Sequence, residues 1–273
     1  MPNALCAAFS SVSIATWNRV EEGRNLYWLG EETLTDLLIR DLLRLQVLGF
    51  NIQAFHKKEE RENGADWEWW FQGSSGKWIG MRVQAKVIHQ HEDKFKELHR
   101  YHGKEAGPRV YQCDDLILSA QTGPYPCVPI YCLYSHWLDP TYNKLLPIWV
   151  SHFDSHNFGC STVTAVAVQR FRKPTAMKKA NRCSLKDTLN YSIPLAGLVC
   201  SPFITNGSIA ERAQDILEVG TKYILDSPPP YVTDLIERQS KQSTRIIERN
   251  LGVEIDLPTG IVGVLAIQQA VQQ

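Results

Sequence analysis

The sequence carries no excess charge of one sign and has no long apolar run. Its 29 lysines and arginines balance 29 aspartates and glutamates, so the net charge is zero. Proteins that coat nucleic acid usually show a basic excess over the whole chain, and this balance argues against that class. It leaves room for an enzyme with a local basic channel. No apolar run approaches the ~20 residues of a membrane helix, and residues 4–9 lack the basic start of a signal peptide.

The cysteines form no C-x-x-C pair of the kind that binds zinc. There are seven of them, scattered along the chain and odd in number. This usage is typical of reduced, mostly buried thiols in a cytosolic protein, and it disfavours a disulfide framework or a zinc site. We therefore expect a cytoplasmic protein without disulfides and without a membrane partner.

What the chain does have is ample material for a core. Hydrophobic residues make up 44% and charged residues 21% of its 273 residues, which is typical of a folded globular protein of one large or two modest domains. There is no internal repeat and no low-complexity segment. The spacing of apolar residues predicts helices in the first half over 4–22, 31–47, 91–101 and 112–121. Alternation and turn residues predict strands over 50–56, 65–71, 78–88 and 128–134.

This order predicts an α/β protein with three parts. Residues 1–24 form an N-terminal helix, and residues 25–140 form a core of the order helix, three strands, helix, strand. Residues 141–273 form a mainly helical region packed on that core. In this last part, 160–172 is compatible with a helix or a strand, and 208–225 and 232–251 are predicted helices.

The two alternating runs 65–71 and 78–88 are joined by a loop rich in glycine and serine, as expected of a β-hairpin. Side chains two apart on a strand share a face, so one face of this hairpin is apolar and the other is polar. A loop centred on Ser75 would pair Asp66 with Gln84 and Glu68 with Arg82. If the apolar face is buried, the polar face is a surface that solvent reaches. It carries Asp66, Glu68, Arg82, Gln84 and Lys86.

A carboxylate, a carboxamide oxygen and a lysine at such distances suit a hard divalent cation, because Mg²⁺ takes few protein oxygens and keeps its waters. Asp66 and Gln84 would supply ligands, and Lys86 would act on an attacking water or stabilise charge in a phosphoryl transition state. Taken alone, the pattern favours the simpler interpretation of surface salt bridges between Asp66 and Lys86 and between Glu68 and Arg82.

The wider pattern resembles the PD-(D/E)XK nuclease superfamily. Asp66 stands in G-A-D-W-E-W-W-F, Gln84 and Lys86 in R-V-Q-A-K, and Glu31 and Glu32 in G-E-E-T-L-T-D at the start of a helix. The similarity is greatest to the Mrr-like branch, in which glutamine replaces the second acid. The same combination resembles an uncharacterised bacterial family assigned to that superfamily. The likeness covers about residues 25–136, with weaker matches at 159–161 and 198–200.

The resemblance implies a restriction-endonuclease-like core (αβββαβ, a small mixed sheet flanked by helices) and a Mg²⁺- or Mn²⁺-dependent endonuclease acting on DNA in bacterial defence or DNA processing. Asp66 and Gln84 would hold the metal, with Glu68 as a further ligand. Lys86 would act in catalysis, supported by Glu31 or Glu32. Two alternatives stay open: an inactive nuclease-fold module that binds nucleic acid or a protein, and an RNase toxin that uses the same site.

Weaker signals concern nucleic-acid contacts and assembly. Residues 165–186 contain seven basic residues and no acidic one, which fits phosphate contacts or a solvated surface loop. Cutting both strands with one metal site normally requires two copies, so we expect a homodimer through helices 208–225 and 232–251, and double-stranded rather than single-stranded DNA. Trp67, Trp69 and Trp70 are expected in the core. The candidate nucleic-acid contacts are Gln112, Arg170, Arg172, Lys173, Lys178, Lys179 and Arg182.

Overall fold

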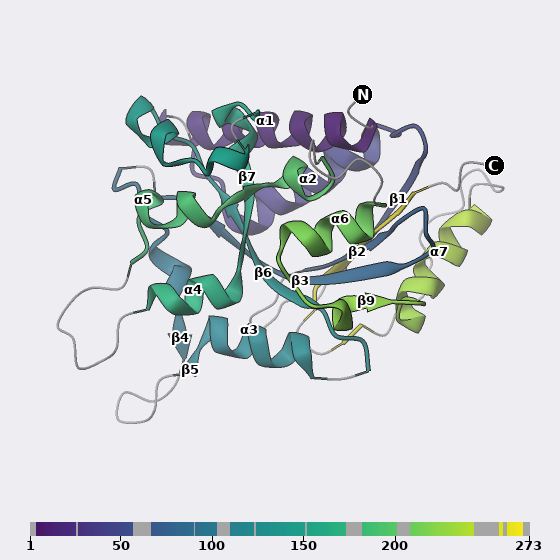
Figure 1. Ribbon diagram of the computed structural model, residues 1–273. Coiled ribbons are helices and arrows are strands. Elements are labelled where there is room, and N and C mark those ends of the chain that lie inside the picture. Colours follow the sequence, from purple (N-terminus) through teal and green to yellow (C-terminus); the bar gives the residue numbers. More distant parts are fainter. Residues whose placement is uncertain are drawn as a thin grey trace.

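A mixed β-sheet lies between helical layers (Figure 1). The computed structural model describes residues 4–25, 27–56, 67–89, 91–102, 110–122, 124–150, 152–172, 182–200, 208–242, 257–258 and 261–269. The strands of the sheet are β1 (Phe50–His56), β2 (Trp67–Gln72), β3 (Trp78–Val87), β6 (Val128–Tyr134), β7 (Cys160–Thr164), β8 (Ile193–Pro194), β9 (Ile224–Leu225) and β10 (Gly263–Gln269). They run in the order β1-β10-β2-β3-β6-β7-β8, and β9 pairs with the start of β3.

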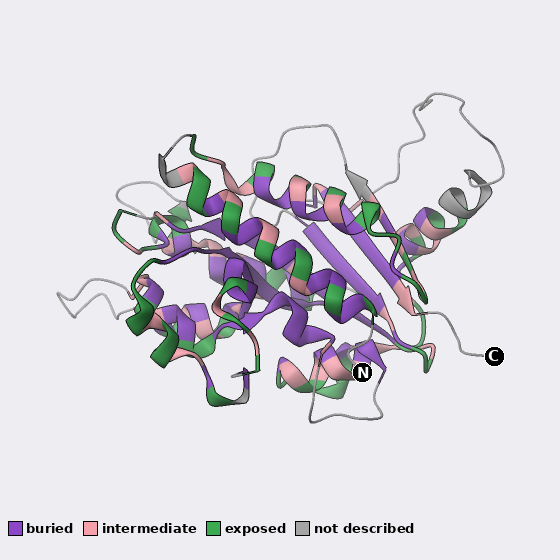
Figure 2. Ribbon diagram, turned by 90° about the horizontal axis from the view of Figure 1, so that it is seen from above, coloured by how far each residue is buried: buried purple, intermediate pink, exposed green. Residues whose placement is uncertain are grey.

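The helices cover both faces of the sheet. In Figure 1, α1 and α2 lie above it and α3 and α4 lie below it, while Figure 2 shows exposed residues on the outer sides of the helices and buried residues along the strands. The α-helices are α1 (Ala4–Asn25), α2 (Glu31–Arg44), α3 (Gln112–Gln121), α4 (Ala165–Phe171), α5 (Leu185–Thr188), α6 (Ile209–Ile216) and α7 (Pro230–Gln242). Short 3-10 helices are η1 (Lys96–His99), η2 (Pro140–Leu145), η3 (Ile148–Val150), η4 (Ser155–Gly159), η5 (Leu189–Tyr191), η6 (Leu195–Leu198) and η7 (Thr221–Tyr223). A separate two-stranded ladder joins β4 (Tyr101–His102) and β5 (Val110–Tyr111).

The β2–β3 hairpin forms the centre of the sheet. Gly76 adopts a φ of +81° in its turn, a left-handed conformation that glycine takes at little cost. Gly80 lies opposite Trp70, and a Cβ at Gly80 would come within 2.5 Å of the Trp70 ring. Gly263 at the start of β10 makes room for Trp67 in the same way. Glycines opposite large aromatic rings therefore allow β10, β2 and β3 to lie side by side.

The structure confirms an α/β protein with an open mixed sheet flanked by helices. It also confirms the helices predicted at the positions of α1, α2 and α3 and the strands at β1, β2, β3 and β6. The segment 160–172, which was compatible with a helix or a strand, contains one of each: the strand β7 is followed by the helix α4. The predicted helices over 208–225 and 232–251 appear as the shorter α6 and α7, and residues 243–251 lie outside the described part.

One predicted helix is absent, and one region contributes more strands to the sheet than predicted. Residues 91–101 do not form an α-helix, because main-chain hydrogen bonds between His89 and Lys94 turn the chain back, with Asp93 at a φ of +48°, and only η1 follows. The described part of the region after residue 140 has more helical than strand residues, but it also supplies β7, β8, β9 and β10 to the sheet, beyond what the sequence predicted. β10 lies between β1 and β2, antiparallel to the first and parallel to the second.

The expectation that no cysteine forms a disulfide was also wrong. Cys6 in α1 is bonded to Cys200, which follows η6. The partners are 194 residues apart, so no spacing in the sequence indicates the pair. The thiols of Cys113, Cys127, Cys132 and Cys160 are free and buried as expected, and that of Cys183 is half-buried. Within the described residues, no helix has the length and apolar character to cross a membrane.

Candidate functional site

The polar residues of the hairpin share one face, as the alternation predicted. Glu68 lies opposite Arg82 in the β2–β3 register, which confirms the predicted pairing. Gln84 and Lys86 follow Arg82 at two-residue steps along β3 and so lie on the same face. Asp66, the predicted partner of Gln84, lies outside the described residues.

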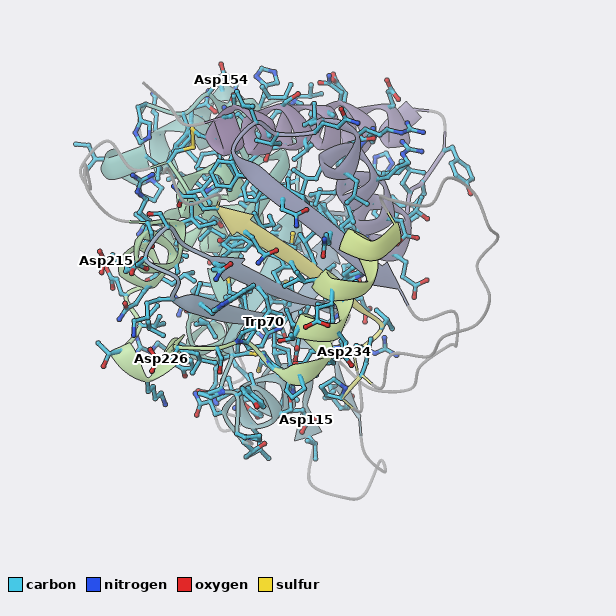
Figure 3. All side chains as sticks on the ribbon, turned by 90° about the vertical axis from the view of Figure 1, so that its right-hand side faces the viewer. Trp70, Asp115, Asp154, Asp215, Asp226 and Asp234 are labelled. Carbon is cyan, nitrogen blue, oxygen red and sulfur yellow. A yellow bond between two sulfur atoms is a disulfide. The ribbon has the colours of Figure 1, made fainter. Side chains whose placement is uncertain are left out.

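This face is covered, and the prediction that solvent reaches it was wrong for Gln84 and Lys86. Each is only 2% exposed. α3 approaches from one side, where Arg82 donates to the Ser119 carbonyl at 2.7 Å, and α7 approaches from another. Figure 3 labels Trp70 of β2 and Asp234 of α7, and α7 lies beside the strand that carries Trp70. The helices α3 and α7 therefore cover a face that the alternation of the hairpin predicted to be exposed to solvent.

Glu68 is fully buried and accepts hydrogen bonds from three side chains. Oε1 accepts from Arg82 Nε at 3.0 Å and Nη2 at 2.5 Å, while Oε2 accepts from Trp70 Nε1 at 3.1 Å and Tyr231 Oη at 2.5 Å. Burial, followed by the charge of Glu68, raises the pKa of Tyr231 far above its usual value, so its hydroxyl remains a donor. A buried carboxylate needs such donors to replace water.

Lys86 forms an ion pair with Glu31 at the start of α2. The Lys86 Nζ and Glu31 Oε2 atoms are 3.2 Å apart, and Glu31 is partly exposed while Lys86 is not. The N-terminal turn of α2 favours a carboxylate at this position through the helix dipole. One turn later, Thr35 hydrogen-bonds the Glu31 carbonyl and the Tyr134 hydroxyl, which ties this end of α2 to β6. The adjacent Glu32 is exposed.

The oxygen donors around Lys86 have the chemistry of a hard-cation site. The described chain offers the Glu31 carboxylate and the Gln84 carboxamide, and Asp66 would add a second carboxylate. Carboxylate and carbonyl oxygens are the ligands that Mg²⁺ takes in proteins. No group of three or more histidine, cysteine, aspartate or glutamate side chains gathers around one point in the described residues.

Two of the candidate nucleic-acid contacts that the structure describes, Arg172 and Arg182, make contacts inside the fold. Arg172 is paired with Asp114 of α3 at 2.6 Å and lies over the Tyr111 ring. Arg182 donates to the Arg170 carbonyl and lies over Phe171. These contacts hold α4 and its flanks against α3 and the β4–β5 ladder.

The remaining candidates have these positions. Gln112 is half-buried at the start of α3, where its backbone N–H donates to the Arg100 carbonyl. Arg170 is exposed on α4. Lys173, Lys178 and Lys179 lie outside the described residues. The tryptophans Trp67, Trp69 and Trp70 are buried, as predicted.

Sequence reasoning missed the Tyr231–Glu68 hydrogen bond and the contact between the Trp28 and His89 rings. Tyr231 lies 163 residues from its partner, and no local pattern marks it. Trp28 could have been singled out from the sequence, because it is a large aromatic residue three positions before Glu31 and lies outside the helices predicted from apolar periodicity.

A family model matches residues 5–255, and its description is a family of unknown function, DUF6615. The chain belongs to this family. Comparison with curated proteins and with solved structures finds no significant match.

Proposed function

We propose that the protein is a metal-dependent endonuclease that hydrolyses phosphodiester bonds of DNA, built on a restriction-endonuclease-like core. The contact between Lys86 and Glu31 carries the proposal. It joins the lysine of Q-A-K to the glutamate at the start of α2, the two elements that the nuclease resemblance links. The chain order α2, β1, β2, β3, α3, β6 also follows the order of such a core, with β3 and β6 parallel. The strand β10 is an addition between β1 and β2.

Each residue has a distinct role in this proposal. Asp66 and Gln84 would hold Mg²⁺ or Mn²⁺, which lowers the pKa of a bound water and neutralises charge on the phosphate. Lys86 would place its ammonium against the charge that develops on the phosphoryl oxygens. Glu31 fixes the direction of that ammonium and is a positioning residue. Glu68 is not assigned as a metal ligand in this proposal, because its oxygens already accept hydrogen bonds from three side chains. Its role is to hold Arg82 in place beside the site.

The test is cleavage of plasmid DNA, single-stranded DNA and RNA with Mg²⁺, with Mn²⁺ and with a chelator. Lys86→Met removes the charge but retains most of the side-chain volume, so the variant is expected to fold. We expect it to lower cleavage by about 10²–10³-fold, as for loss of a preorganised charge in other enzymes. The matched control is Lys77→Met in the turn of the same hairpin, where the lysine is half-exposed and pairs with the exposed Asp226. Wild-type cleavage rates in the Lys86→Met variant would contradict the proposal.

The burial of the site favours a second candidate, an inactive nuclease-fold module that binds nucleic acid or a protein. With Gln84 and Lys86 each 2% exposed, a phosphodiester reaches Nζ only if neighbouring groups move. Metal-independent binding without cleavage of any of the three substrates would select this candidate. Cleavage of RNA alone would select a ribonuclease with the same site.

Double-strand cleavage would require a homodimer. The described apolar residues of α6 and α7 do not form a free stripe for such a contact, because Ile209, Ala213, Val232 and Leu235 pack inside the chain. Residues 243–251, the remainder of the second helix predicted for the contact, lie outside the described part. A light-scattering mass of twice the 31.0 kDa chain supports the dimer, and a mass of one chain contradicts it.

A further inference from the structure

Trp28 is unusual among the tryptophans of this protein. Its exposed fraction is 44%, whereas the other tryptophan side chains that the structure describes are exposed by 5% or less. The preceding residue, Tyr27, is 74% exposed. Single exposed apolar residues are common on protein surfaces. Exposure of two large aromatic residues that are adjacent in the sequence is less common and is typical of a binding surface.

The Trp28 ring is held in place by a second ring. Trp28 and His89 have centroids 5.1 Å apart with an interplanar angle of 39°. His89 is itself fixed by its main chain, since its N–H donates to the Lys94 carbonyl at 2.7 Å and its carbonyl accepts from the Lys94 N–H at 3.4 Å. The contact with the His89 ring restricts the rotation of the indole before any ligand arrives, which lowers the entropic cost of binding.

This ring pair lies next to the Glu31–Lys86 pair. The segments 28–31 and 86–89 are joined at one end by the Trp28–His89 contact and at the other by the Glu31–Lys86 ion pair. The two contacts are three positions apart on each segment, a span of at most ~11 Å. Lys86 is buried and Glu31 is partly exposed, so a substrate would approach the ion pair from the side of the segment 27–31.

We infer that Trp28, supported by His89, stacks an unpaired base of the DNA strand whose phosphodiester lies at Glu31 and Lys86. The inference rests on the proposed function and adds that the substrate is single-stranded, or unpaired at this point. A tryptophan ring stacks any base, because every base has a π-face, and a stacked base contributes strongly to single-strand binding. In a duplex both faces of each base are occupied by its neighbours, so the platform selects unpaired strands. This departs from the double-stranded substrate expected from the sequence.

The test measures binding of the full chain, in a chelator, to a fluorescent oligothymidylate, to the same strand paired with oligoadenylate, and to an oligouridylate. Trp28→Ala should weaken oligothymidylate binding by about 5- to 100-fold. Trp28→Phe keeps a ring and should restore binding to within about threefold of wild type. Tyr191→Ala removes another exposed ring, which lies in η5 edge-on to Phe171; it is the matched control and should have no effect. Binding of the duplex should be the same in all variants.

The inference fails if Trp28→Ala binds oligothymidylate as wild type does, if Trp28→Phe loses as much affinity as Trp28→Ala, or if the wild type binds only the duplex or only the oligouridylate. These results are distinct from failure of the proposed function. Loss of cleavage in Lys86→Met with unchanged binding in Trp28→Ala would contradict only the stacking role of Trp28. A Trp28-dependent preference for the single strand, without cleavage by any form of the protein, would contradict only the proposed nuclease activity.

Discussion

The Tyr231 hydroxyl donates a hydrogen bond of 2.5 Å to Glu68 Oε2, although the two residues are 163 positions apart in the sequence. The contact ties α7 to the central hairpin at a carboxylate that is fully buried. The other oxygen of the same carboxylate forms an ion pair with Arg82, which also donates a hydrogen bond to the Ser119 carbonyl of α3. One buried charge thus links β2, β3, α3 and α7.

Tyr231→Phe should destabilise the protein by about 1–3 kcal/mol, because it removes one donor from a buried carboxylate that water does not reach. The midpoint of urea unfolding should fall with an unchanged slope. Tyr191→Phe is the control, since its hydroxyl makes no such contact with a buried charge. An equal midpoint for Tyr231→Phe and the wild type would show that the hydrogen bond contributes nothing to stability.

The sequence was sufficient for the hairpin and for the shared face of Gln84 and Lys86, because period-two alternation and a turn are local signals. The pairing of Glu68 with Arg82 also followed from the loop length. The burial of this face could not be predicted in the same way. It depends on helices from other parts of the chain, above all α7, whose Tyr231 lies 163 residues from Glu68.

The helix predicted over 91–101 shows a second limit. Its polar and basic residues fit a helix by composition, but the main-chain hydrogen bonds of Lys94 to His89, and its bridge to Ser184, override that preference. Contacts with residues far away in the sequence determine the structure of such segments, and a single sequence does not reveal those contacts. The Cys6–Cys200 disulfide was missed for the same reason.

His99 should make the stability depend on pH. Burial, with a smaller effect of the Arg172 charge, lowers the pKa of His99 below its usual value, against the opposing effects of the Arg182 carbonyl and Asp187. The neutral ring donates from Nε2 to the Arg182 carbonyl at 2.8 Å. The unfolded chain therefore binds a proton at higher pH than the folded chain does. Stability is lost as the pH falls through ~6.5 towards the lower folded pKa.

The measurement is the urea midpoint at about pH 7.5 and about pH 5.5. His99→Gln retains a donor but does not titrate, so its midpoint should change less between the two pH values than that of the wild type. His91→Gln, at an exposed histidine, should keep the wild-type change. The explanation is wrong if His99→Gln and the wild type lose the same stability on acidification.

Reduction of the Cys6–Cys200 disulfide should destabilise the fold by about 2–5 kcal/mol, because it frees a loop that spans most of the chain in the unfolded state. Thermal unfolding with and without a thiol reductant measures this effect. Cys6→Ser should unfold at the reduced wild-type temperature and should not respond to reductant. Cys183→Ser, at a half-buried free thiol, should still respond. A wild-type melting temperature that is insensitive to complete reduction would rule out a stabilising role.

Glu31 and Glu32 provide the sharpest comparison at the candidate site, since they are adjacent and only one contacts Lys86. Glu31→Gln removes the charge that directs the Lys86 ammonium, and displacement of a catalytic group by about 1 Å can cost about 10²-fold in rate. We therefore expect Glu31→Gln to lower the cleavage rate at saturating DNA by about that factor, while Glu32→Gln stays within about twofold. Both changes remove one carboxylate from the first turn of α2, so their effects on the helix dipole should match, but only Glu31→Gln removes the charge paired with the buried Lys86. Equal cleavage by the two variants would mean that the first-turn carboxylates act only through the helix, and that the 3.2 Å contact with Lys86 has no part in the reaction.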